Sequence, residues 1–135
     1  MSEDIARRWL DQAAQTANTH DTDAHMDLIS RRVSLHGERE LESITWDDWK
    51  KQVSHEFREG LLKRVSYTGL KMIASTGNGV MFKTFETVEA SDGTVRAQGL
   101  EMLLALEEDG KWRLVQERIM PEEETAADGL LPGRH

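Results

Sequence analysis

Three glycine-containing turns divide the second half of the chain, and they constrain its fold more than any other feature. They are Gly77-Asn78-Gly79, Asp92-Gly93 and Asp109-Gly110. Each lies between segments that are rich in β-branched residues or that alternate apolar and polar ones, which is typical of β-hairpins. The sequence therefore predicts four antiparallel strands, at about 63–76, 80–90, 94–106 and 111–120. The composition of 96–107 would equally suit a helix, but the flanking Asp-Gly turns favour a strand.

The first half of the chain predicts mainly helices. A first helix is expected near the N-terminus, where apolar residues recur at helical spacing: Ile5, Trp9, Leu10, Ala13 and Ala17. A short second helix is expected after Asp21. Val33 and Leu35 alternate with polar residues, so they predict a brief strand that ends at Gly37, and the charged segment 38–43 predicts a loop.

A third helix has the clearest local signature. Thr45 and Asp48 have the spacing of a capping box, in which each side chain accepts a hydrogen bond from the other residue's backbone. Ile44 and Trp49 occupy the two positions of a hydrophobic staple, and Gly60 can end the helix. The sequence thus predicts an α+β fold in which three N-terminal helices form a cone on a curved antiparallel sheet that encloses a pocket.

The two Asp-Gly turns predict which residues pair across the sheet. If each turn has two residues, Leu100 lies opposite Phe85, Met102 opposite Glu117, and Leu104 opposite Val115. One face of the sheet then forms an apolar pocket floor, and Trp9 and Trp49 form its roof. The expected floor residues are Met72, Phe85, Leu100, Met102, Leu104 and Val115.

The other face of this predicted sheet is also apolar. Helices can cover only one face, and a large exposed apolar sheet is unfavourable in a monomer, so we expect a homodimer through the outer face. The residues expected in that interface are Tyr67, Ile73, Phe82, Leu103, Trp112 and Leu114.

The charge of the chain argues against nucleic acid as a partner. Its 25 acidic and 17 basic residues give a net charge of −8, which repels phosphate backbones. The absence of cysteine fits a reducing compartment, and no apolar run is long enough for a membrane span or a signal peptide, so a cytoplasmic location is expected. Residues 1–121 are expected to form a single domain, and 122–135 an acidic, mobile tail.

The order of these elements resembles the nuclear transport factor 2-like, or SnoaL-like, superfamily. The most specific matching segments are Val33-Ser34-Leu35-His36-Gly37 and the last hairpin, from Asp109 to Glu117. The resemblance covers about residues 3–120 and implies helices and a curved sheet around a pocket. The superfamily includes isomerases, dehydratases, hydrolases and non-catalytic binding proteins, so the fold alone implies no activity.

The catalytic residues of known relatives are only partly matched. In ketosteroid isomerase-like members the catalytic positions look like Ala13, His36 or Gly37, and Met102, which do not support that chemistry. Limonene epoxide hydrolase-like members use an Asp-Arg-Asp set, and its last aspartate looks like Glu117. The positions of the arginine and the first aspartate look like Lys83 and Phe85.

Three candidate catalytic residues follow from the predicted register and the resemblance. Glu117 lies between apolar Val115 and Ile119, so burial would raise its pKa and suit it to proton transfer. Lys83 is expected on the same face, where it either assists Glu117 or forms a structural ion pair with it. His36 is expected at the end of its strand, either aimed into the cavity or bonded to backbone or water.

No cofactor or metal is expected. His36, Glu38 and Glu40 lack a recognised ligand spacing, and Gly77-Asn78-Gly79 lacks the helix and lysine of a phosphate-binding loop. The sequence therefore predicts a protein that binds a small, largely apolar molecule. The alternative is a hydrolase, lyase or isomerase that uses Glu117 as a general base.

Overall fold

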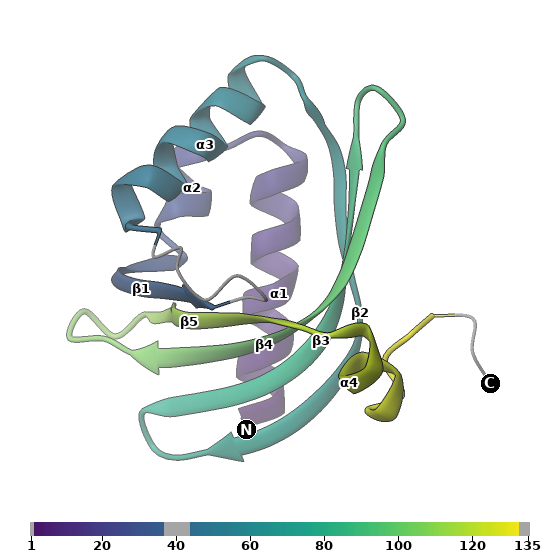
Figure 1. The fold of residues 1–135 in the computed structure, drawn as a ribbon. Helices are drawn as coiled ribbons and strands as arrows, with labels where there is room; N and C mark the ends of the chain where they lie inside the picture. Colours follow the sequence, from purple (N-terminus) through teal and green to yellow (C-terminus); the bar gives the residue numbers. More distant parts are fainter. Residues whose placement is uncertain (1, 37–43, 133–135) are drawn as a thin grey trace.

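The computed structural model describes residues 2–36 and 44–132 and shows an α+β fold with a curved sheet (Figure 1). The predicted strand at about 94–106, whose composition would equally suit a helix, is confirmed. The predicted end of a strand at Gly37 and the predicted loop at 38–43 lie outside the described residues. The elements are α1 (Ser2–Asn18), α2 (Thr22–Met26), β1 (Ile29–His36), α3 (Trp46–Arg58), β2 (Leu62–Ser75), β3 (Gly79–Ala90), β4 (Val95–Leu106), β5 (Trp112–Met120) and α4 (Glu122–Ala127).

The sheet has five strands in the order β1-β5-β4-β3-β2. The four strands β2 to β5 form the predicted antiparallel meander. The short strand predicted around Val33 is longer than expected, and it pairs with β5 in parallel, so the sheet is mixed and not wholly antiparallel. The long strands bend so that α1, α2 and α3 lie on the concave side and α4 lies on the opposite side (Figure 1).

The three N-terminal helices differ in length, and the second is short, as predicted. α1 has 17 residues, α2 has five, and α3 has 13. The capping box of α3 is confirmed, because the Asp48 backbone N–H donates to the Thr45 hydroxyl at 3.1 Å and the Thr45 N–H donates to the Asp48 carboxylate. The concave side is therefore covered by one long helix with shorter ones beside it, and not by a regular cone of three.

The predicted register of the β3–β4 hairpin is wrong by one residue. Ala90 and Thr94 are hydrogen-bonded at the base of the turn, so the loop contains three residues, and Gly93 takes a left-handed conformation with φ of 92°. Glycine is common at that position in three-residue hairpin loops. Leu100 consequently lies opposite Thr84 and not opposite Phe85.

This single-residue shift exchanges the two faces of β3, because side chains alternate along a strand. Phe82, expected in a dimer interface, faces the helices and is fully buried. Phe85 and Lys83, expected in the pocket, lie on the convex outer face, where Phe85 packs with Met120 and Leu130.

The β4–β5 hairpin also has a three-residue loop, but a bulge corrects its register. A shift between Leu103 and Leu104 restores the predicted pairs of Met102 with Glu117 and Glu101 with Arg118. Closer to the turn, Leu104 pairs with Leu114, so its predicted pairing with Val115 is wrong.

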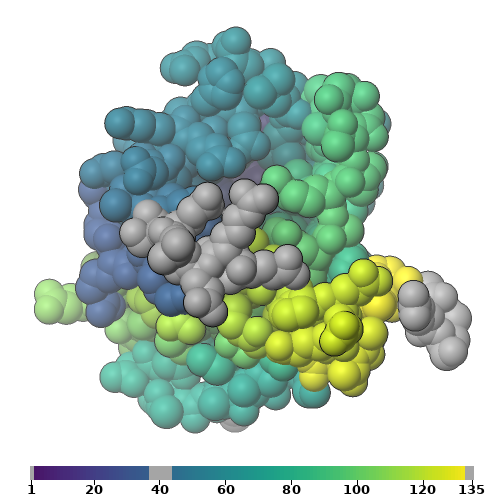
Figure 2. Space-filling model, viewed as in Figure 1, coloured from purple at the N-terminus to yellow at the C-terminus, as the bar shows by residue number. Residues whose placement is uncertain are grey.

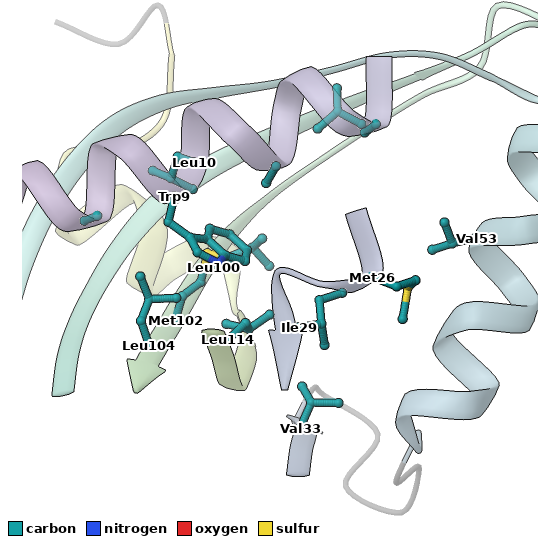
Figure 3. Packing of buried hydrophobic residues seen from close by; sticks show 14 of the residues in the cluster. Trp9, Leu10, Met26, Ile29, Val33, Val53, Leu100, Met102, Leu104 and Leu114 are labelled. Carbon is teal, nitrogen blue, oxygen red and sulfur yellow. The ribbon is translucent and has the colours of Figure 1, made fainter. Parts of the chain in front are cut away.

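The core lies between α1 and the concave face of the sheet. Figure 3 shows Trp9 extending from α1 toward Leu100, Met102 and Leu114. The Trp9 indole N–H also donates to the Leu28 carbonyl at 3.1 Å, which ties α1 to the start of β1. No helix in the described ranges is long and apolar enough to cross a membrane.

The residues after Pro121 do not form the expected loose tail. They begin with α4, and its Thr125 is buried against Gly99 of β4, while Leu130 lies close to Gly69 of β2. Figure 2 shows α4, in yellow, at the surface beside the strands. The short acidic segment folds there because Lys83 and Arg118 of the outer face bind its carboxylates.

Several residues expected in the dimer surface lie on the helix-covered side of the sheet and not on the outer face. Tyr67, Trp112 and Leu114 pack against the core under the helices, as does Phe82. Of the six residues expected there, the two that do not pack against this core are Leu103, which is partly exposed on the outer face, and Ile73, which is 42% exposed.

Candidate functional site

A cavity of about 360 Å³ lies between the concave face of the sheet and the helices. Three of the expected lining residues, Trp9, Trp49 and Met102, contribute to its wall. Most of the lining is apolar, and it comes from α1, α2, α3 and all five strands. The apolar lining residues are Trp9, Ala17, Leu28, Ile29, Leu35, Ile44, Trp49, Val53, Phe57, Leu62, Val65, Val88, Met102, Leu114 and Ile119.

The other expected lining residues are elsewhere. Leu100 and Leu104 are fully buried in the core beneath α1, and Met72 packs against that core. Phe85 lies on the outer face, as described above. Val115 is the additional residue of the β5 bulge and is not part of the cavity wall that the described residues form.

The sheet side of the cavity carries a polar cluster, which we define as Tyr67, Glu86, Arg96, Gln98 and Glu117. Within this cluster the Tyr67 hydroxyl donates to Oε2 of Glu86 at 3.1 Å. The Gln98 amide donates to Oε1 of the same carboxylate at 3.4 Å. Glu86 is thus held in place by one donor on each of its oxygens.

Glu117 is the exceptional member of the polar cluster. It pairs with Met102 across the sheet and with Leu35 of β1, and its side chain is partly buried in the cavity wall. Within 2–36 and 44–132 no group donates a hydrogen bond to its carboxylate, whose oxygens are not fully buried. Burial, together with the Glu86 carboxylate, raises the pKa of Glu117 to about 8, although Arg96 acts to lower it.

The same surroundings also shift the pKa of two neighbours of Glu117, namely Glu86 and Tyr67. Burial raises the pKa of Glu86, although Tyr67, Arg96 and Gln98 each act to lower it. Burial also raises the pKa of Tyr67 well above its usual value, as do the two carboxylates, so its hydroxyl keeps its proton. The cluster therefore contains two interacting carboxyl groups that disfavour simultaneous ionisation.

His25 lines the helical side of the cavity. Its Nδ1 is hydrogen-bonded to the Thr16 hydroxyl at 2.8 Å, and its ring meets Phe57 edge to face. Burial lowers the pKa of His25 to about 4, so this imidazole is neutral at physiological pH. The residues that the structure describes contain no group of His, Asp and Glu side chains arranged to hold a metal ion.

The three residues predicted as catalytic do not come together. Lys83 binds Asp128 at 2.8 Å and Glu124 at 3.1 Å on the outer face, and these carboxylates raise its pKa. His36 is exposed at the end of β1, where its ring is 3.3 Å from the Ser34 hydroxyl. Only Glu117 faces the cavity, so a site composed of Glu117, Lys83 and His36 does not form.

Sequence analysis missed the residues that do surround Glu117. The incorrect register placed Glu86 on the outer face, beside Phe82. With a three-residue Asp92-Gly93 loop, the same pairing rules would have placed Glu86 opposite Gln98 on the face that bears Glu117.

Comparison with solved structures shows the same fold in other proteins. A nuclear transport factor 2-like protein of unknown function from Shewanella oneidensis MR-1 is 16% identical, with a TM-score of 0.71 over 88% of this chain and 98% of that one. A putative scytalone dehydratase from Novosphingobium aromaticivorans is 7% identical, with a TM-score of 0.71 over 87% and 81% of the two chains.

A protein of unknown function with a cystatin-like fold from Nostoc punctiforme is 10% identical, with a TM-score of 0.65 over 87% and 88%. No protein-family model and no curated protein matches the sequence. The chain therefore has the nuclear transport factor 2-like fold, and at these identities the likeness establishes the fold alone.

Proposed function

We propose that this protein binds a small, largely apolar molecule in the cavity, with Glu117 as the polar anchor. The observation that carries the proposal is a carboxylate without a hydrogen-bond donor from the described residues, on the wall of a largely apolar cavity. An unpaired buried carboxyl group is costly, so a protein that gained nothing from it would be more stable with an apolar residue there. A bound molecule with a hydrogen-bond donor would compensate that cost.

The cavity also has the features of ligand sites in general. Most of its wall is apolar and aromatic, and five of its polar side chains form the polar cluster on the sheet side, which would orient a molecule that has one polar end. The polar cluster is fixed by the hydrogen bonds of Tyr67 and Gln98 to Glu86, so little ordering is needed on binding.

Native mass spectrometry of the purified protein tests this function through molecules that co-purify with it. Ile119→Trp would fill part of the cavity, and Leu103→Trp places the same side chain on the outer face as a control. We expect a bound mass that the first variant loses and the second retains. A bound mass that survives Ile119→Trp would place the ligand elsewhere and refute the proposal.

A second candidate function is catalysis of proton transfer, as in a hydrolase, lyase or isomerase, with Glu117 as the general base. The raised pKa of Glu117 favours this function, because a base works best when its pKa is close to the operating pH. The test is deuterium incorporation into, or chemical change of, the co-purified molecule in D₂O. Wild-type protein should produce it and Glu117→Gln should not; equal behaviour of the two would exclude this chemistry.

A further inference from the structure

In the polar cluster, the carboxyl oxygens of Glu86 and Glu117 outnumber the side chains that donate hydrogen bonds to them. The two oxygens of Glu86 already accept from Tyr67 and Gln98. Both oxygens of Glu117 lack a donor from the described residues and are not fully buried, so they are open to a bound molecule in the same cavity. A molecule that complements this cluster must therefore bring donors, and a molecule that brings further acceptors would leave them unsatisfied.

The ionisable side chains that line the cavity are also mostly acidic. Glu86 of β3, Glu117 of β5 and Glu56 of α3 contribute three carboxyl groups to its lining. Arg96 of β4 is the one lysine or arginine among the lining residues of the described chain, and it is exposed, so solvent screens much of its charge. His25 on α2 is neutral because burial lowers its pKa, and the Tyr67 phenol keeps its proton.

We propose that the ligand of this cavity is an amine, with an apolar body against the aromatic wall and a protonated amino group bound to Glu117. This inference rests on the function proposed above and specifies its ligand class. The geometry that supports it is the unpaired carboxylate at the polar side of an apolar cavity, next to a second carboxylate that is already fixed by its own donors.

An ammonium group suits this site better than a neutral or anionic group does. It would neutralise Glu117 through charge-assisted hydrogen bonds, which are about twice as strong as neutral ones. Its charge would also offset the repulsion between Glu117 and Glu86, which a hydroxyl group cannot do. A carboxylate ligand would add a further negative charge beside Glu86 and Glu117 and is expected to bind most weakly.

Three probes that share one apolar body separate these possibilities: 1-naphthylmethylamine, 1-naphthalenemethanol and 1-naphthoate. Isothermal titration calorimetry at pH 7 should show the amine binding about tenfold or more tightly than the alcohol, and the naphthoate binding most weakly. Most of Glu117 is protonated at pH 7 before binding, because its pKa is about 8, so binding of the amine should release protons. Titration in two buffers of different ionisation enthalpy measures that release.

Glu117→Gln keeps the shape of the side chain but removes its charge. It should lower the affinity for the amine to that for the alcohol and abolish the proton release, while the affinity for the alcohol changes little. Glu101→Gln is the matched control, because Glu101 pairs with Arg118 on the outer face and should leave the preference intact. It controls for general attraction of a cation to an acidic protein.

The outcomes separate the ligand class from the proposed function. Alcohol binding as tight as amine binding, or an amine preference that survives Glu117→Gln, would overturn the amine proposal while the binding function stands. If no probe binds and Ile119→Trp has no effect on any co-purified mass, both proposals are refuted together.

Discussion

Replacing Glu117 with glutamine should stabilise the protein, and the gain should grow with pH. The physical reason is that burial and the Glu86 carboxylate raise the pKa of Glu117 from 4.5 to about 8. In the folded state the protonated form is favoured, whereas in the unfolded chain the group ionises normally. The stability that Glu117 supports is therefore complete below pH 4.5 and is lost as pH rises toward 8.

The size of the effect follows from the shift. Each unit between the folded and unfolded pKa corresponds to about 1.4 kcal/mol, so at pH 7 the carboxyl group costs about 3 kcal/mol relative to a neutral isostere. Urea denaturation of wild type and Glu117→Gln at pH 4.5, 6, 7 and 8 measures the difference in the free energy of unfolding. It should be small at pH 4.5 and should increase by about 1.4 kcal/mol per pH unit above that.

Glu124→Gln provides a control of opposite sign. Arg118 lowers the pKa of Glu124 to about 2, so the ionised group stabilises the fold above pH 4.5, and this contribution is lost as pH falls toward 2. Its side chain is 32% exposed, so solvent screening reduces the expected loss at pH 7 to about 1 kcal/mol. A difference for Glu117→Gln that is independent of pH, or a variant less stable than wild type at pH 8, would refute the reasoning.

Three further predictions concern the scaffold. Thr45→Ala removes the α3 capping box and should lower the free energy of unfolding by about 1 kcal/mol in urea denaturation; no change would mean that the cap is redundant. Gly99→Ala places a Cβ 2.3 Å from the Thr125 hydroxyl, so it should cost about 1–3 kcal/mol and expose the chain after Pro121 to proteolysis, whereas Gly77→Ala, which meets nothing within 4 Å, should do neither. A dimer through the outer face stays a prediction: sedimentation velocity at micromolar concentration should detect a dimer that Leu103→Arg dissociates, and a monomeric wild type would refute it.

The features that sequence analysis predicted correctly depend on residues close together in the chain. The Thr45 capping box, the helical spacing of α1 and the glycine turns each depend on contacts within a few residues, so local chemistry specifies them. The pair of Met102 and Glu117 was also predicted, although the β4–β5 loop has three residues. It holds because the bulge after Leu103 compensates the longer loop.

The errors arise where loop length and long-range contacts decide the structure. An Asp-Gly pair is compatible with both two-residue and three-residue loops, and the choice moved Lys83 and Phe85 out of the cavity and Glu86 into it. The helix after Pro121 has no apolar stripe of its own. Its docking depends on space above Gly99 and on basic side chains of distant strands, which no local pattern reveals.

The corrected register also explains why the cavity lacks a partner for Glu117. Lys83 and Arg118 lie on the outer face, where they bind Glu124 and Asp128 and hold α4 against the sheet. Because the side chains of a strand alternate between faces, the same basic residues cannot both dock α4 and neutralise Glu117. The fold thus uses its central basic side chains for stability on the convex face and leaves the concave face with acceptors, and this division is the physical basis for expecting a ligand that supplies the missing positive charge.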